Sequence, residues 1–136
     1  PPSRRAPRQG GEQFRLCYTA LTMERRALYR RIEERVDSMI ERGLINEVTL
    51  LLARGCHPRL QSMQGLGYKE IIYYLRGLCT LPQAVYLLKR NTRRFAKRQW
   101  TWFRRDPRIV WVEVPADGKI EPAIAEIIRL AEGVFY

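Results

Sequence analysis

The sequence predicts an α/β chain that is predominantly helical, with two short strands at about residues 14–21 and 109–114. Apolar residues recur at the three- and four-residue spacing of a helix over most of the chain, whereas two short runs are apolar without that spacing. Gly, Pro and Thr stand where these segments begin or end. Because two strands alone make a poor sheet, we expect the strands to need further sheet partners.

The first strand, FRLCYTAL (14–21), is short, rich in apolar residues and bounded by polar ones, which favours a buried strand. Residues 1–13, rich in Pro, Gly and Arg, are expected to be a flexible lead-in to a core of residues 14–136. Thr22 is expected to cap a helix that runs to about Arg42. The apolar stripe of this helix consists of Leu28, Ile32, Val36, Met39 and Ile40.

The remaining elements follow from the same spacing and from the residues that start or stop helices. They are helices at about 45–54, 68–77, 81–104 and 122–133, a loop at 56–67, and the second strand at 109–114. Thr80 is expected to cap the long helix at 81–104, whose first turn tolerates Pro82.

Composition narrows the class of protein. The 136 residues include 25 Lys and Arg against 14 Asp and Glu, a net charge of +11, which implies a polyanionic partner such as nucleic acid or phosphate. The three cysteines lie far apart and there is one histidine, so neither a disulfide framework nor a metal site is expected in the chain. No apolar run is long enough to span a bilayer, so we expect a cytoplasmic protein without a membrane partner.

The most distinctive stretch, TRRFAKRQWTWFRRD (92–106), lies mostly within the helix expected at 81–104. At 100° per residue, one side is predicted to face the core. It carries Val85, Leu88, Thr92, Phe95, Gln99 and Trp102. The opposite half carries Lys89, Arg90, Arg93, Arg94, Lys97 and Arg98. No acidic residue of the helix lies beside these cations. This absence favours polyanion binding over a solvated face. Tyr86 and Trp100 fit base stacking and ordinary surface exposure equally well.

Two further features leave alternatives open. Arg35 projects at the edge of an apolar stripe, either covering the core with its stem or gripping a phosphate with its planar fork. Gly65 and Gly67 precede a helix, where backbone N–H groups can meet an anion, although an ordinary turn explains them as well. The phosphate-binding pattern GxxxxGK[ST] is absent, and no Asp stands among the cations as a base.

Three segments together resemble a known family. They are LTMERRALYRRIEERVDSMIERGLINEV (21–48), SMQGLGYKEI (62–71) and TRRFAKRQWTWFR (92–104). In this order and spacing they are similar to the C-terminal half of the tRNA dimethylallyltransferases, also called tRNA isopentenyltransferases. The resemblance extends over about residues 14–114, and the third segment is its most specific part.

The resemblance implies a transferase that moves a dimethylallyl group from dimethylallyl diphosphate, with Mg²⁺, to N6 of the adenine 3′ of the anticodon (position 37). The family fold is a P-loop-like, nucleotide-binding α/β core with an inserted helical domain. The family's P-loop, its catalytic Asp and most of the insertion have no counterpart here and are expected to precede residue 1. We therefore expect the chain alone to be inactive, with Mg²⁺ bound mainly by those missing parts.

By position, Arg35 matches the family arginine that contacts the donor diphosphate and stabilises its transition state. Two stretches match those that contact the tRNA anticodon stem-loop. They are Arg59, Leu60, Gln61, Ser62, Met63 and Gln64, and Thr92, Arg93, Arg94, Phe95, Ala96, Lys97, Arg98 and Gln99. Gln64 stands where some relatives carry Arg. The expected partners are tRNA and dimethylallyl diphosphate, with a monomeric full-length protein. The alternative is a stand-alone basic RNA- or DNA-binding module without catalysis.

Overall fold

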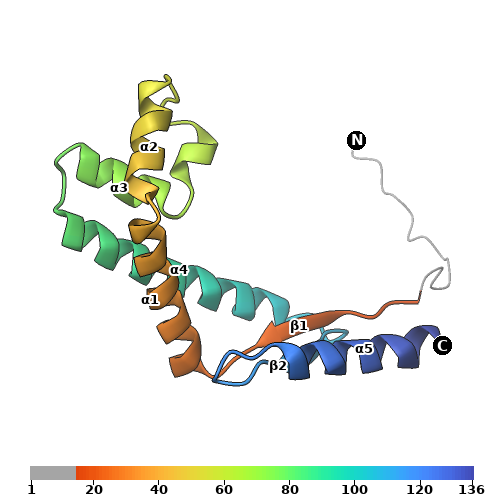
Figure 1. Cartoon of the computed structure of the whole chain (residues 1–136). Coiled ribbons are helices and arrows are strands. Elements are labelled where there is room, and N and C mark those ends of the chain that lie inside the picture. Colours follow the sequence, from red (N-terminus) through yellow and green to blue (C-terminus); the bar gives the residue numbers. More distant parts are fainter. Residues whose placement is uncertain (1–14) are drawn as a thin grey trace, which may run out of the picture. The chain divides into compact units, whose positions relative to one another are not determined.

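The computed structural model describes residues 15–136, which form two compact units (Figure 1). One unit contains residues 15–22 and 108–136, and the other contains residues 23–107. The expected lead-in at 1–13, together with Phe14, lies outside the described residues. The predicted fold class is confirmed, because the described chain is mostly helical and has a small parallel sheet.

The sheet of the first unit pairs β1 (Thr19–Thr22) in parallel with β2 (Val110–Glu113). The ladder extends by one bond at each end, since Val110 N–H donates to the carbonyl of Tyr18 at 2.9 Å and Val114 N–H donates to that of Thr22 at 2.7 Å. Both predicted strands are therefore present, but shorter than predicted. Residues 15–18 are irregular because β2 provides pairing for only four residues of β1.

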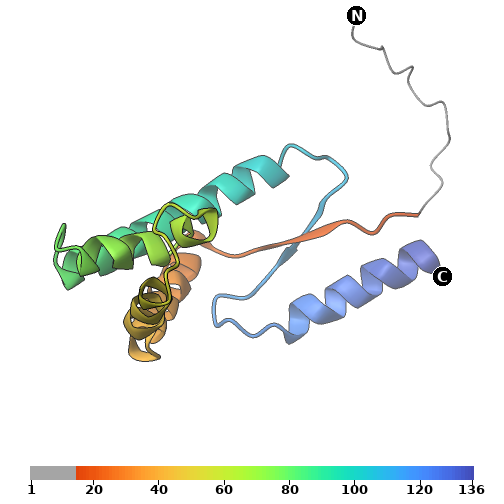
Figure 2. The same ribbon diagram turned by 90° about the horizontal axis from the view of Figure 1, so that it is seen from above.

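The prediction of a buried first strand is wrong for Leu21, which is 58% exposed. On the other strand, Val112 is buried and Val110 is 45% exposed. In this unit β2 is covered by α5 (Glu121–Phe135), which contributes the buried Ala123 (Figure 2). A two-stranded sheet with one covering helix buries only part of its apolar surface, as expected for strands that need further partners.

The second unit begins with α1 (Arg25–Glu41), and its N-terminal cap differs from the prediction. Glu24 rather than Thr22 caps the helix, because its carboxylate accepts hydrogen bonds from the N–H groups of Arg26 and Ala27, each at 2.9 Å. Thr22 instead belongs to β1. The two backbone hydrogen bonds hold the pKa of Glu24 below its ordinary value.

The other predicted helices of this unit are present with ends shifted by one or two residues. They are α2 (Leu44–Ala53), α3 (Tyr68–Leu75) and α4 (Leu81–Phe103), and the predicted loop contains a 3-10 helix, η1 (Gln61–Gln64). The cap of α4 is confirmed. Thr80 accepts from the Gln83 N–H, and the Gln83 side chain accepts from the Thr80 N–H at 2.8 Å, which is a capping box.

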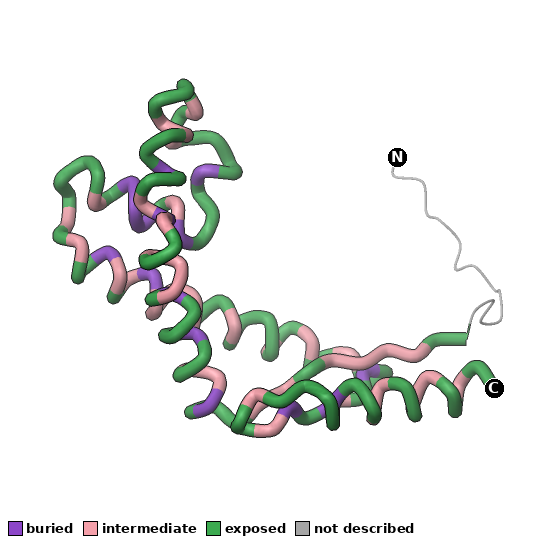
Figure 3. The backbone as a smooth tube through the Cα atoms, in the orientation of Figure 1, coloured by how far each residue is buried: buried purple, intermediate pink, exposed green. Residues whose placement is uncertain are grey.

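A single apolar core joins the elements of the second unit. Its buried residues come from α1, α2, η1, α3 and α4, and Figure 3 shows them spread along these helices. They are Val36, Leu44, Val48, Met63, Ile71, Ile72 and Leu88. Every element from α1 to α4 therefore contributes to positioning the cationic helix.

The predicted core face of α4 is wrong in its second half. Leu88 is 1% exposed, but Phe95 is 43% exposed and Trp102 is 65% exposed. The side-chain hydrogen bonds and ion pairs that join α4 to α1 and α3 involve residues 89 to 93. Beyond these residues the apolar side of α4 continues without a covering helix from this unit, so it stays exposed.

Candidate nucleic-acid interface

Five of the six cations of α4 divide into two sets, and the first set faces α1. Lys89 Nζ lies 2.7 Å from a carboxylate oxygen of Asp37, and Arg93 Nη1 lies 3.4 Å from one of Glu33. The Arg93 guanidinium also lies over the ring of Tyr29, at 5.8 Å from its centroid. Lys89 and Arg93 thus help to hold α4 against α1.

These pairs explain why fewer cations of α4 are unpaired than the sequence predicted. The helix has no acid of its own beside its cations, as the sequence shows, but α1 supplies two from a distant part of the chain. Because the side chains of Asp37 and Glu33 are at least half exposed, each pair contributes about 0–1 kcal/mol to stability. The pairs therefore mainly fix the position of α4 against α1 and add little to the stability of the chain.

The second set is Arg94, Lys97 and Arg98, which are exposed. Among residues 15–136 no carboxylate forms an ion pair with any of them. Arg94 and Arg98 are i,i+4 neighbours of like charge, a spacing that costs a few tenths of a kcal/mol until an anion binds. This set is therefore the part of α4 that is available to a polyanion. Arg90 belongs to neither set, because it is half-buried and donates to the side-chain oxygen of Asn91.

Exposed aromatic side chains accompany these cations. Phe95 and Trp102 are exposed, as is Trp100, over whose ring the Arg104 guanidinium lies at 4.8 Å from the centroid. Trp102 packs edge-to-face on Phe103, with ring centroids 5.3 Å apart. Flat apolar rings beside unpaired cations suit a single-stranded nucleic acid, whose bases stack while its phosphates pair.

The predicted contact stretch at 59–64 lies mostly at the surface. Five of its residues are exposed, namely Arg59, Leu60, Gln61, Ser62 and Gln64. Met63 is only 2% exposed, because η1 turns this side chain into the core shared with Leu88. An RNA contact by the Met63 side chain would have to displace it from that core.

The same loop is tied to itself by two hydrogen bonds. The Gln64 amide donates to the carbonyl of Pro58 at 2.6 Å, and the Arg59 N–H donates to Nδ1 of His57 at 3.0 Å. The Gln64 side chain therefore closes the loop, whereas the Arg59 guanidinium stays at the surface.

In the second stretch, Thr92 is half-buried and donates to the carbonyl of Leu88 at 2.8 Å.

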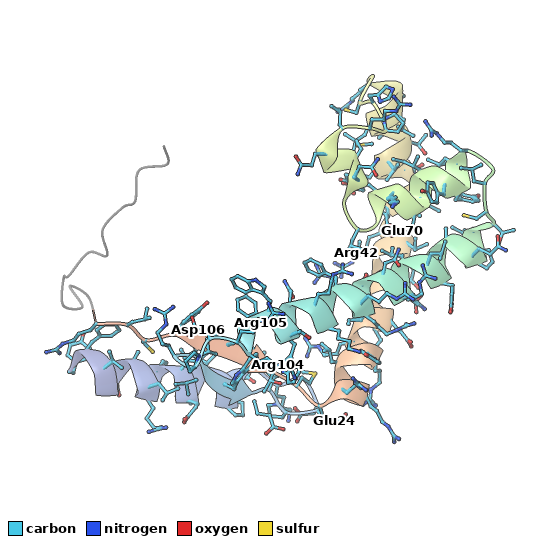
Figure 4. The ribbon with its side chains drawn as sticks, turned by 180° about the vertical axis from the view of Figure 1, so that it is seen from behind. Glu24, Arg42, Glu70, Arg104, Arg105 and Asp106 are labelled. Atoms are coloured by element: carbon cyan, nitrogen blue, oxygen red, sulfur yellow. The ribbon has the colours of Figure 1, made fainter. Side chains whose placement is uncertain are left out.

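The glycine pair is used as a turn, at least at Gly67. This residue has a φ of +97°, which favours glycine, and its N–H donates to the Glu70 carboxylate at 2.9 Å. That N–H is consequently not available to an external anion. Glu70, which is labelled in Figure 4, also accepts from the Asn91 amide at 2.8 Å, a link between α3 and α4 that was not predicted from the sequence. A Glu at the third helical position after Gly67 indicates the capping bond to Gly67 but not the bond to Asn91.

Arg35 lies on α1 and is exposed. At 100° per residue it projects roughly 160° from Asp37, so it lies away from the flank that pairs with α4. Among the described residues it has no hydrogen bond, ion pair or ring contact. The structure therefore leaves its guanidinium accessible, but brings it to no other predicted contact residue.

The described residues offer no metal centre. Within residues 15–136, no three His, Cys, Asp or Glu side chains gather closely enough to hold an ion. These residues therefore do not fit Mg²⁺ by themselves. In the same part of the chain, none of the helices combines the length and apolar character required to cross a bilayer.

Comparison with known proteins then identifies the family. A model of the IPP transferases matches residues 1–106, which is most of the chain. The chain belongs to the IPP transferase family. Its relatives in that family include the tRNA dimethylallyltransferase of Pelotomaculum thermopropionicum, 60% identical over 121 residues, and that of Carboxydothermus hydrogenoformans, 60% identical over 106 residues.

The fold agrees with solved IPP transferases. The full-length tRNA isopentenylpyrophosphate transferase of Bacillus halodurans matches with a TM-score of 0.82 and 46% identity, over 90% of this chain and 40% of that one. The matches with the two curated relatives cover 89% and 78% of this chain. They cover only 38% and 34% of the relatives' own length. The chain thus corresponds to somewhat over a third of an IPP transferase.

Proposed function

We propose that this chain is the tRNA- and diphosphate-contacting part of a tRNA dimethylallyltransferase. The whole enzyme transfers the dimethylallyl group of dimethylallyl diphosphate to N6 of adenine 37, next to the anticodon. The observation that carries the proposal is the set Arg94, Lys97 and Arg98, exposed on α4 without a carboxylate partner in a chain of the IPP transferase family. We also propose that the full-length enzyme acts in the cytoplasm and is a monomer.

In the reaction, N6 forms a bond to the first carbon of the dimethylallyl group. The bond from that carbon to the diphosphate oxygen breaks, the diphosphate leaves with the electron pair, and N6 loses a proton to a base. Arginine is suited to the charge that develops on the leaving diphosphate. We assign that role to Arg35 and assign neither the base nor any step through Mg²⁺ to these residues.

The tRNA contacts are proposed to lie on two surfaces of the unit formed by residues 23–107. On α4 they are Arg94, Lys97, Arg98 and Gln99, with Phe95 available for stacking. On the loop at 59–64, Arg59 supplies the charge. Arg93 would have to exchange Glu33 and Tyr29 for a phosphate, so we expect a smaller contribution from it.

A transfer assay tests the proposal. The chain alone, incubated with tRNA, dimethylallyl diphosphate and Mg²⁺, is expected to produce no prenylated adenine. A chimera, in which this chain replaces the corresponding part of the Pelotomaculum relative, is expected to catalyse the transfer. In that chimera Arg35→Ala is expected to lower kcat about a hundredfold or more, as for loss of a transition-state donor.

Arg30→Ala is the matched control, because Arg30 is another exposed arginine of α1. Equal losses for the two variants would refute the role of Arg35, and a chimera without transfer would refute the assignment of the whole chain. The stand-alone module, in contrast, predicts tight and selective RNA binding by the chain alone, whereas we expect weak binding without preference for the anticodon stem-loop.

A further inference from the structure

Glu70 is the one charged or polar residue that is buried in the described part of the chain, at 3% exposure. Both of its carboxylate oxygens are occupied. Oε2 accepts the Gly67 N–H at 2.9 Å, and Oε1 accepts the Asn91 side-chain amide at 2.8 Å. The carboxylate therefore joins the start of α3 to the middle of α4.

Each end of this link adjoins a stretch proposed to contact RNA. Gly67 ends the loop that contains residues 59–64, and Asn91 immediately precedes residues 92–99. The Asn91 oxygen in turn accepts from Arg90, with Nη2 at 3.3 Å. One buried carboxylate thus stands between two surface segments that are distant in sequence.

A helix cap explains only half of this arrangement. The capping box of α3 uses Oε2 alone, and an exposed Glu would serve it as well. The bond from Oε1 to Asn91 adds nothing to the cap and requires the side chain to be buried against α4. Burying a carboxylate is costly unless it is fully hydrogen-bonded, and the bond from Asn91 satisfies Oε1 at this buried position while it ties α3 to α4.

We propose that Glu70 and Asn91 are positioning residues that hold the loop at 59–64 and the stretch at 92–99 at one fixed separation, so that a single RNA contacts both. The inference rests on the proposed function, in which both segments contact tRNA. Two contacts reinforce each other on one ligand only when their spacing is fixed in advance. Without the link, each segment would bind the RNA independently. The segment with the weaker contact would then no longer contribute to the affinity.

The hydrogen-bonding pattern of the pair provides selective variants. Asn91→Ala removes the link and leaves the Gly67 cap in place. Glu70→Gln and Asn91→Asp, made singly, place donor against donor or carboxylate against carboxylate. The double variant Glu70→Gln/Asn91→Asp reverses the direction of the bond. Its Gln amide donates to the new carboxylate, its Gln oxygen accepts from Gly67, and Arg90 keeps an acceptor.

The experiment measures binding of an anticodon stem-loop RNA over a series of salt concentrations, using the full chain. Arg59→Ala and Arg98→Ala are each combined with the wild-type pair, with Asn91→Ala and with the reversed pair. In the wild-type background each substitution is expected to lower the slope of log K against log salt by about 0.7–0.9, the value for one phosphate contact. With Asn91→Ala, the loss for Arg98→Ala should persist and that for Arg59→Ala should vanish. The reversed pair should restore the loss for Arg59→Ala and leave that for Arg98→Ala in place.

Thr80→Ala is the matched control, since it removes a helix cap of α4 without touching the link. It should leave both losses unchanged. If Arg59→Ala has its full effect in the Asn91→Ala background, or if the reversed pair restores nothing, the inference is overturned although the proposed function stands. If neither arginine matters in the wild-type background, the proposed RNA contacts are themselves wrong and the inference fails with them.

Discussion

Carboxylates have different uses in the unit formed by residues 23–107, and three of these uses follow directly from their surroundings. Glu24 is exposed and accepts two backbone N–H groups at the start of α1. Glu33 and Asp37, exposed on α1, pair with cations of α4. Glu70 is buried and joins two elements. The acids of the chain therefore decide which of its cations remain available to an RNA.

Glu24→Gln should reveal the cap through its pH dependence. The pKa of Glu24 is lowered in the folded chain by the hydrogen bonds from Arg26 and Ala27. The stabilisation is therefore fully present above the unfolded pKa of about 4.3 and is lost as the pH falls through the folded pKa. We expect the variant to have a Tm a few degrees below wild type at neutral pH, measured by circular dichroism, and a smaller difference in acid.

Glu34→Gln is the control for this measurement, because Glu34 is exposed on the same helix and caps nothing. It should leave the Tm nearly unchanged at every pH. A Tm difference between Glu24→Gln and wild type that stays constant from neutral to acid pH would show that the Glu24 carboxylate does not cap α1.

At the scale of elements, α4 is one helix with two environments. Its first half is packed between α1 and α3, which bury Ala84 and Leu88 and pair with residues 89 to 93. Its second half presents Phe95, Trp102 and the exposed cations. A continuous amphipathic pattern therefore does not imply continuous burial, because burial also depends on how far the neighbouring helices extend.

Two apolar truncations on α4 test this division. Leu88→Ala should lower the free energy of unfolding by about 2–5 kcal/mol, as for a buried leucine that leaves a cavity. Phe95→Ala, on the same side of the helix, should change it by less than about 0.5 kcal/mol, as for a surface position. Urea denaturation measures both. Comparable losses would mean that the second half of α4 is packed in the folded chain.

The sequence predicted the elements well where local signals determine them. The Thr80 cap, the apolar spacing of α1 and α4 and the two strands are local features, and the structure contains each of them. Prediction from the sequence failed where the burial or pairing of a side chain depended on residues distant in the chain. The pairing of Lys89 and Arg93 with α1, the exposure of Phe95, and the bond from Asn91 to Glu70 all join segments whose contact no local pattern reveals.

For the residues of the candidate site, the structure reports exposure and contacts within the chain, not contacts with a ligand. Arg94, Lys97, Arg98 and Arg59 were named from the sequence and lie exposed. Met63 was named with them but is buried, because the resemblance identifies a stretch of chain rather than the direction of each side chain. The contact roles of these residues, and that of Arg35, stay predictions.

At the scale of the whole molecule, the net charge of +11 makes salt dependence the property that separates binding from packing. Cations that pair with α1 already have acidic partners, whereas the cations of the second set have no carboxylate partner among the described residues that a phosphate would have to displace. Two double substitutions on α4 remove the same charge from these two sets. The chain therefore contains its own control.

The most direct test of the account compares Arg94→Ala/Arg98→Ala with Lys89→Ala/Arg93→Ala in binding to an anticodon stem-loop RNA over a series of salt concentrations. The first pair is expected to lower the slope of log K against log salt by about 1.4–1.8, the sum for two phosphate contacts, and the second pair by clearly less. Equal slopes for the two double variants would contradict the account. So would an unchanged slope for Arg94→Ala/Arg98→Ala, because α4 would then present only a solvated face.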